Sequence, residues 1–262
     1  MSAVFSRDGD AFVPALESRA SWYPDALHGG PVAALFARAV EEAASATEMM
    51  VSRLTVDLMR PVPTNPLRVA TRVVREGRRI QVIDAMMTEG DTEVARASAL
   101  RIRVGAVSVP DHPRQPVPAA AESAPAAELR PAGEAWFHTA AIEMREVAGG
   151  FFEPGPATAW IRLTMPLWDD AETTPLQRVA AAADFGNGVS RVLDTKRHVF
   201  INADLSVHLH RYPAGEWVCL DSRTDIDDTG VGLAQSELFD ESGAIGHALQ
   251  MLYVDTREGF GA

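Results

Sequence analysis

One carboxylate stands in an otherwise apolar helical segment of this sequence. Asp184 follows four consecutive alanines, Ala180–Ala183, and the segment opens with Thr174 and Pro175, which are typical of a helix N-terminus. Alanine side chains allow other backbone to pack close to such a helix. A charged group is costly to bury without a partner, so Asp184 is either an exposed residue at the end of the helix or part of a functional site.

A second helix carries a different chemical feature at its start. Apolar residues recur at helical spacing from Val32 to Ala43, which predicts a helix over about residues 31–44, opened by Gly29, Gly30 and a first-turn proline. Backbone N–H groups at the start of a helix are free to donate, and the helix dipole favours negative charge there. Such groups could stabilise a carbonyl oxygen as it becomes an oxyanion.

The two halves of the sequence resemble each other. The segment Leu54–Arg60 aligns with Leu205–Arg211, and Val32 aligns with Val179 when a loop insertion is allowed. Matches that stay in register across a helix and several strands indicate an internal duplication. The alternative explanation is that two amphipathic segments of similar composition align by chance.

The duplication shows where the halves differ in kind. Three polar residues of the second half align with apolar residues of the first: Asp184 with Ala37, Asn202 with Val51, and Gln250 with Ala99. Conversely, Gly29-Gly30 of the first half align with Leu176-Gln177. Each half therefore lacks what the other has, and a single composite site is expected where the halves pack together.

The composite set has a chemical use. Asp184 could accept a proton from a water molecule held by Asn202 and Gln250, while N–H groups at Gly29 and Gly30 stabilise the oxyanion. The sequence has no recognisable Ser-His-Asp or Cys-His motif, which favours water as the nucleophile. These residues therefore predict hydrolysis of an activated carbonyl compound without a cofactor or a metal ion.

The elements that position this site form an α+β pattern. Alternating strand-like runs are predicted at residues 11–13, 54–59, 67–74, 80–88 and 94–104, and residues 135–147 and 158–164 are expected to supply the first strands of the second half. One helix followed by an antiparallel meander indicates a sheet wrapped around that helix, once in each half. The proline-rich segment 105–133 reads as a linker, which gives a first domain over 1–104 and a second over 134–262.

Composition limits the partners of the chain. Its 262 residues carry a net charge of −12, which argues against nucleic acid or an anionic membrane as a partner. The sequence lacks an apolar run long enough to span a bilayer and a signal-peptide core, so we expect no membrane partner and a cytoplasmic protein. The single cysteine, Cys219, excludes an internal disulfide. His208 and His210 share a strand face but lack a third ligand at suitable spacing, and we expect His28 to cap or pack against its helix.

Four segments together resemble a known family. They are His28-Gly29-Gly30 before a helix, the helix end Ala183–Gly188, the strand Phe200–Arg211 and the closing Gly246–Gln250. These segments are similar to the thioesterase-like, double hotdog superfamily that includes acyl-CoA thioesterase II, and the resemblance covers nearly the whole chain apart from the linker. It implies two fused hotdog folds, each a long helix wrapped by an antiparallel sheet. It also implies a hydrolytic water arranged by an Asp, a Thr or Ser, and a Gln.

Two of the three candidate catalytic residues match the pattern of this family, and one departs from it. Asp184 and Gln250 match the Asp and the Gln, whereas Asn202 stands where a hydroxyl residue is expected. The implied substrate is acyl-CoA or a related acyl thioester, and pairing of double hotdogs into a homo-oligomer is open. Two other functions remain: a non-catalytic protein that binds acyl thioesters, or an enoyl-CoA hydratase, which would need an Asp and a His acting together.

Overall fold

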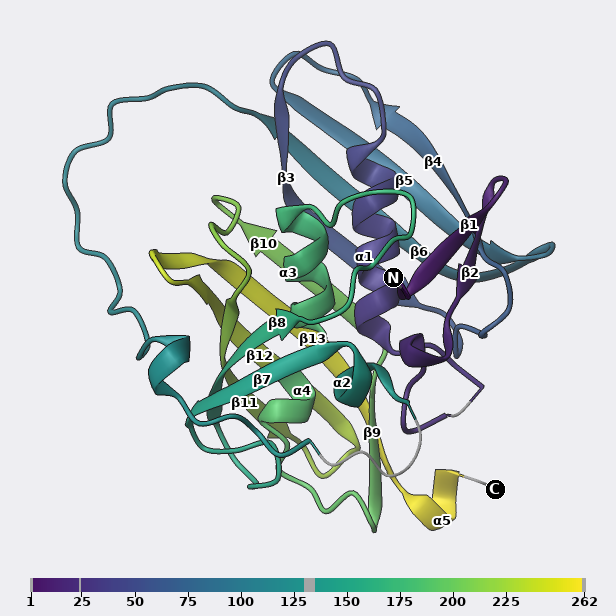
Figure 1. Cartoon of the computed structure of the whole chain (residues 1–262), viewed down its shortest axis with the longest axis vertical. Helices are drawn as coiled ribbons and strands as arrows, with labels where there is room; N and C mark the ends of the chain where they lie inside the picture. Colours follow the sequence, from purple (N-terminus) through teal and green to yellow (C-terminus); the bar gives the residue numbers. More distant parts are fainter. Residues whose placement is uncertain (1, 24, 130–134, 261–262) are drawn as a thin grey trace.

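Two central helices are enclosed by one long, curved antiparallel sheet (Figure 1). Figure 1 shows a computed structural model that describes residues 2–23, 25–129 and 135–260. The helices α1 (Gly29–Glu41) and α3 (Pro175–Ala183) pack against each other, and their apolar side chains fill the concave side of the sheet. The predicted α+β architecture, with a helix wrapped by antiparallel strands in each half, is confirmed.

The remaining elements follow in chain order. The first half contains β1 (Phe5–Asp8), β2 (Ala11–Pro14), η1 (Leu16–Ser18), β3 (Met49–Leu58), β4 (Arg68–Arg75), β5 (Ile80–Glu89) and β6 (Thr92–Arg103). The second half contains η2 (Ala121–Ser123), α2 (Phe137–Ala140), β7 (Ile142–Ala148), β8 (Ala157–Leu163), α4 (Gly186–Val189), β9 (His198–Asn202), β10 (Asp204–Leu209), β11 (Val218–Ile226), β12 (Val231–Asp240), β13 (Gly243–Thr256) and α5 (Arg257–Phe260).

The strand order has an approximate two-fold symmetry. The sheet runs β4-β5-β6-β3-β10-β13-β12-β11-β8-β7, and β9 pairs with β13. The duplicated strands β3 and β10 lie side by side at its centre, where Thr55 is opposite Ser206 and their hydroxyl oxygens are 3.1 Å apart. These two residues are equivalents in the sequence alignment, so the symmetry axis passes between them. The same axis relates β6 to β13 and β5 to β12, as the duplication predicts.

Local sequence explains both central helices. Thr174 and Gln177 form a capping box at the start of α3, with Pro175 in the first turn. Helix α1 begins two residues earlier than predicted and includes both glycines, because the His28 side chain caps the helix at that point. It also ends earlier, at Glu41. Just beyond this end, the Arg101 guanidinium donates to the carbonyl of Ala43 at 2.8 Å. This bond supplies the carbonyl with a partner that a further helical turn would otherwise provide.

The predicted linker has two parts in the structure. Residues 104–117 have no regular structure and are exposed, and they form the long arch that stands away from the rest of the chain in Figure 1. The following segment is attached to the second half. The Trp160 indole N–H donates to the carbonyl of Ala119 at 2.7 Å, and the Ala127 N–H donates to the carbonyl of Met144 at 2.9 Å. The predicted end of the linker at residue 133 lies outside the described residues.

Candidate active site

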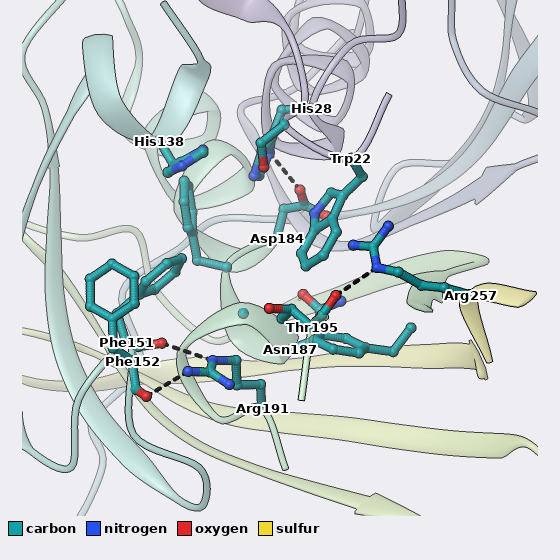
Figure 2. Close-up of a pocket in the computed structure, with 14 residues that line it drawn as sticks. Trp22, His28, His138, Phe151, Phe152, Asp184, Asn187, Arg191, Thr195 and Arg257 are labelled. Carbon is teal, nitrogen blue, oxygen red and sulfur yellow. Dashed lines mark hydrogen bonds and ion pairs between the residues drawn. The ribbon is translucent and has the colours of Figure 1, made fainter. Parts of the chain in front are cut away.

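Asp184 lies where the C-terminus of α3 meets the N-terminus of α1 (Figure 2). It is the C-cap residue of α3, and its side chain is only 4% exposed. Its carboxylate rests directly against Gly29: a Cβ atom built on Gly29 would lie 2.5 Å from Oδ1 and 2.7 Å from Oδ2. The position at a helix N-terminus favours negative charge on the carboxylate.

Both oxygens of this carboxylate have fixed partners. Oδ1 accepts hydrogen bonds from the Asn202 amide at 2.8 Å and from the Gln250 amide at 3.3 Å. Oδ2 lies 2.8 Å from Nδ1 of His28. The three partners come from the end of β9, from β13 and from the N-cap of α1. The carboxylate is therefore held in one orientation by both halves of the chain.

Gln250 is the most enclosed member of this group. It is 1% exposed, its Nε2 also donates to the backbone carbonyl of Asp184 at 3.1 Å, and its Oε1 accepts from the Asn187 N–H at 3.0 Å. Gly186 leaves room for it, because a Cβ there would lie 2.9 Å from that same Oε1. All the hydrogen bonds that Gln250 makes to the described residues fix the turn between α3 and α4 and the Asp184 carboxylate.

His28 is a residue whose proximity to Asp184 the sequence does not reveal. Its Nδ1 lies 2.8 Å from Asp184 Oδ2 and also 3.1 Å from the N–H of Gly30. One nitrogen cannot donate to the carboxylate and accept from Gly30 at the same time. A proton on Nδ1 joins His28 to Asp184, whereas a bare Nδ1 caps α1 and requires the proton to be on the carboxyl group.

The imidazole of His28 is held in place by aromatic rings. It stacks on Phe185 at a centroid distance of 4.8 Å and lies 5.3 Å from the ring of Phe137. Its Nε2 has no hydrogen bond to any described residue, and His28 lines a cavity. The second nitrogen is therefore available to a bound molecule.

The two glycines of α1 have different roles. The His28 N–H donates to the carbonyl of Ser18 at 2.9 Å, the Gly30 N–H is engaged by His28, and Pro31 has no N–H. Within the described chain this leaves the N–H of Gly29 without a partner in the first turn. Gly30 instead permits close packing of the helices, because a Cβ there would lie 2.6 Å from the backbone oxygen of Ala181.

Two cavities meet at Asp184, and both are lined by Trp22, His28, Asp184, Asn187 and Phe200. The first, the aromatic cavity, has a volume of about 280 Å³ and is also lined by Ser21, His138, Phe151, Phe152, Phe185, Gly188, Arg191, Thr195 and Arg257 (Figure 2). The second, the aliphatic cavity, has a volume of about 360 Å³ and is also lined by Ala20, Tyr23, Ala26, Leu27, Gly29, Val32, Leu58, Arg60, Pro61, Val62, Ile201, Asn202, Ala203 and Tyr253.

Other groups with reactive side chains are held in neutral forms. Burial, followed by the charge of nearby His28, lowers the pKa of His138 to about 4, so this imidazole is neutral at neutral pH. Burial also raises the pKa of Cys219, which lies in the core and remains a thiol. Over residues 2–23, 25–129 and 135–260, no group of three or more His, Cys, Asp or Glu side chains could hold a metal ion.

The structure brings together most of the residues selected from the sequence. Asp184, Asn202, Gln250 and Gly29 lie at one point, while Gly30 faces α3. His28 and the cavity walls were not selected, because their positions depend on how the two halves pack. A buried carboxylate, an adjacent imidazole, an amide and a free helix N–H at the junction of two cavities can activate water and stabilise an oxyanion.

Comparisons with known proteins agree with this geometry. Residues 18–102 match the family description "Acyl-CoA thioesterase N-terminal domain", and residues 110–254 match "Acyl-CoA thioesterase C-terminal domain". The comparison with curated proteins gave no match. In the described part of the chain, no helix is long and apolar enough to cross a membrane.

Solved structures share the double hotdog fold. A candidate thioesterase II from Thermobifida fusca YX superposes with a TM-score of 0.75 at 14% identity, covering 96% of this chain and 95% of that one. A hotdog protein of unknown function from Alicyclobacillus acidocaldarius gives 0.72 at 18% identity, with 96% and 95% covered. Acyl-CoA thioesterase II TesB2 from Mycobacterium marinum gives 0.68 at 14% identity, also with 96% and 95% covered. At these identities the likeness concerns the fold, and the predicted tandem hotdog is confirmed.

Proposed function

The chain belongs to the acyl-CoA thioesterase family, and we propose that it hydrolyses an acyl thioester with a water molecule activated by Asp184. In this reaction the water oxygen bonds to the thioester carbon, the carbon–sulfur bond breaks, and a free acid and a thiol are formed. The observation that carries the proposal is the Asp184 carboxylate, fixed by Asn202, Gln250 and His28 at the junction of two cavities.

Asn202 is suited to hold the attacking water. Its Nδ2 donates to Asp184 Oδ1, and this bond turns its own carbonyl oxygen to a place where the described residues offer it no hydrogen bond. Asn202 also lines the aliphatic cavity beside Asp184. A water between the two side chains donates one hydrogen to each, which directs a lone pair of its oxygen towards the substrate. An amide can thus perform the orienting role of a hydroxyl residue.

Gly29 is suited to stabilise the oxyanion. Its N–H has no partner among the residues that the structure describes, and Gly29 lines the aliphatic cavity next to Asp184. A thioester carbonyl placed there receives this hydrogen bond and the positive end of the helix dipole as its oxygen becomes negative. Gly30 contributes by keeping α1 against α3 and not by donating to substrate, since its N–H faces His28.

His28 is suited to hold the carboxylate during the reaction. With its proton on Nδ1, which lies 2.8 Å from Oδ2, the imidazole donates to Asp184 and orients it. The proton that Asp184 takes from water can then return from the carboxyl group to the departing thiolate. Gln250 takes no direct part; it fixes the carboxylate through contacts with the protein alone.

The test is release of free thiol from acyl-CoA substrates of different chain lengths by wild type, Asp184→Asn and Gln250→Ala. We expect turnover by wild type, its loss in Asp184→Asn, and a partial loss in Gln250→Ala. Equal turnover by wild type and Asp184→Asn would refute the assigned site.

Two other outcomes would change the assigned function. Ligand-induced thermal stabilisation without turnover across the panel would identify a binding protein. Conversion of enoyl-CoA to hydroxyacyl-CoA without thiol release would identify a hydratase, for which the Asp184–His28 pair offers the required acid and base.

A further inference from the structure

A separate pocket opens beyond the C-terminal end of α1, whereas Asp184 lies at the N-terminal end of this helix. The 13 residues of α1 place its two ends about 18 Å apart. The pocket forms where β4 and β6 end and where β3 and β5 begin, and its volume is about 680 Å³. We call it the arginine pocket; its lining residues are Thr47, Arg75, Gly77, Arg78, Arg79, Ile80 and Arg103.

The four arginines of this pocket have no partners in the protein. All four are exposed, and none of their guanidinium groups forms an ion pair with a carboxylate of the described residues. Arg72, another exposed arginine of β4, does form such a pair, with Asp84 at 3.2 Å. The guanidinium groups of the arginine pocket are therefore available to an external anion.

Two carboxylates belong to the same segments, and they do not cancel the four positive charges. Glu76 lies in the turn between β4 and β5, but its Oε2 accepts from the buried Gln81 amide at 3.1 Å. Glu48 is exposed and follows Thr47. With both carboxylates counted, positive charges still exceed negative charges, in a chain whose net charge is −12. A local excess of this kind indicates a site for an anion.

The duplication shows that the fold does not require these arginines. The alignment that places Leu54 on Leu205 also places the β4–β5 turn on the β11–β12 turn. There the equivalents of Arg78 and Arg79 are Thr229 and Gly230, and the turn carries two aspartates, Asp227 and Asp228. The basic character is therefore a property of the first half alone.

The pocket also has hydrogen-bond donors without a partner. The Thr47 hydroxyl oxygen is buried, and no described residue forms a hydrogen bond with it. The backbone N–H groups of Gly77, Arg78 and Arg79 likewise have no partner among the described residues. Because buried hydroxyl groups are nearly always hydrogen-bonded, an unpaired one at the wall of a pocket indicates a position for a ligand oxygen. These donors and the guanidinium groups together fit an anion rich in oxygen atoms.

We propose that the arginine pocket binds a small molecule with two or more linked phosphate groups, at a site separate from Asp184. Guanidinium groups form bidentate, charge-assisted hydrogen bonds with phosphate oxygens. Arginines on β4, on the turn and on β6 can contact adjacent phosphates at the same time. The volume of the pocket lies in the range of about 300–1,000 Å³ that is typical of small-molecule sites. The negative net charge of the chain disfavours nucleic acid and anionic membranes.

Calorimetry with pyrophosphate tests the proposal. We expect wild type to bind pyrophosphate at least about tenfold more tightly than orthophosphate, and we expect Arg78→Gln and Arg103→Gln each to weaken pyrophosphate binding about tenfold. Arg72→Gln is the matched control, because it removes an exposed arginine of β4 that does not line the pocket; it should change the affinity less than about twofold. ADP carries the same diphosphate on a nucleoside, so tighter binding of ADP than of pyrophosphate identifies a nucleotide, and equal or weaker binding identifies an inorganic polyphosphate.

Thr47→Val tests the unpaired hydroxyl. The substitution should not lower the melting temperature, because it removes a buried polar group that has no partner. It should weaken pyrophosphate binding about tenfold, since the hydroxyl donates to a charged oxygen. Unchanged affinity would show that Thr47 takes no part in the site.

Three results would overturn the proposal. The first is absent pyrophosphate binding, or equal affinities for orthophosphate and pyrophosphate. The second is an equal loss of affinity in Arg72→Gln and Arg78→Gln, which would show non-specific attraction. The third is binding of an oligonucleotide or of anionic vesicles, lost in Arg78→Gln, without binding of pyrophosphate; this would assign the arginines to a macromolecular partner.

Thiol release distinguishes this site from the proposed active site. A raised KM for an acyl thioester in Arg78→Gln or Arg103→Gln would place these arginines in the substrate site and overturn the proposal. Pyrophosphate binding by a wild type that hydrolyses no thioester would still support the arginine pocket and would refute the proposed function instead.

Discussion

Substituting alanine for either of the two adjacent glycines of α1 should have different effects: Gly29→Ala should lower activity, and Gly30→Ala should lower stability. In Gly29→Ala, the new Cβ would lie 2.5 Å from Asp184 Oδ1, so the carboxylate must retreat by about 1 Å to reach ordinary van der Waals separation. The retreat disturbs the hydrogen bond from Asn202 and the contact with His28. The perturbation therefore falls on the carboxylate and not on the backbone.

The expected size follows from that displacement. A misplacement of about 1 Å at a reacting group can cost roughly 10²-fold in rate, which corresponds to about 2.7 kcal/mol of transition-state stabilisation. Stability should change little, because alanine improves helix propensity by up to about 1 kcal/mol while the side chain of Asp184 adjusts. The assay is kcat for thiol release together with the melting temperature of Gly29→Ala.

Gly30→Ala is the matched variant. Its Cβ would lie 2.6 Å from the backbone oxygen of Ala181, and backbone cannot rotate away as a side chain can. We expect overpacking of about 1–3 kcal/mol and a melting temperature lowered by roughly 2–10 °C. If Gly29→Ala kept wild-type kcat, or if it melted lower than Gly30→Ala, the assigned contacts of Asp184 with α1 would be wrong.

Three further predictions concern single polar contacts. Asn202→Thr should keep kcat within about tenfold of wild type, because a hydroxyl can hold the same water, whereas Asn202→Ala should lower kcat further; steady-state kinetics compare them. His28→Phe keeps the ring packed between Phe137 and Phe185 but should lower kcat about 10²-fold, because the Asp184 carboxylate loses the N–H that orients it; steady-state kinetics measure the loss. Burial raises the pKa of Glu41, so its contribution to stability is present below the ordinary carboxyl range and is lost as pH rises through the raised pKa; urea unfolding should show wild type losing stability relative to Glu41→Gln over that pH window.

The fold was predictable because its signals are local and repeated. Helical spacing, the Thr174-Pro175 start and the alternating strands mark the elements, and the duplication supplies their order. The β1 strand was not predicted, since Phe5–Asp8 is too short to show alternation and is fixed by packing of Phe5 on Trp168 at a ring distance of 5.4 Å. The docking of the Ala119 region on Trp160 likewise depends on a tertiary hydrogen bond that proline-rich composition does not reveal.

The candidate site was predictable only in part, for a related reason. Asp184, Asn202 and Gln250 stand out because they replace apolar residues at equivalent positions of a repeated sequence. His28 has no such signal: its nearness to Asp184 arises from the antiparallel packing of α1 on α3, which brings the start of one helix to the end of the other. The cavities also combine residues from distant segments, so their walls follow from the tertiary structure.

The same antiparallel packing creates a second helix junction, which can be compared with the junction at Asp184. At the far end of the pair, the Glu41 carboxylate of α1 meets the start of α3, where Oε2 accepts from the Thr174 hydroxyl at 2.8 Å and from the Gln177 amide at 2.9 Å. The Trp168 indole N–H donates to Gln177 Oε1 at 2.7 Å and completes this buried network. Both junctions place a carboxylate at a helix N-terminus, which is favourable in each case.

The two junctions differ in the partners of the carboxylate. The donors to Glu41, Thr174 and Gln177, bond only to protein groups in the described chain. The residues around Asp184 instead have groups without a partner among the described residues: Nε2 of His28, the carbonyl oxygen of Asn202 and the N–H of Gly29. These three groups are available to a bound molecule. Removal of each carboxylate should therefore have separate consequences. Glu41→Ala leaves the partly buried Thr174 hydroxyl and the buried Gln177 amide without this acceptor and should lower stability by about 1–3 kcal/mol with kcat retained, while Asp184→Asn should abolish turnover with a smaller effect on melting. We therefore infer that the junction at Glu41 stabilises the helix pair, while the junction at Asp184 forms the proposed site.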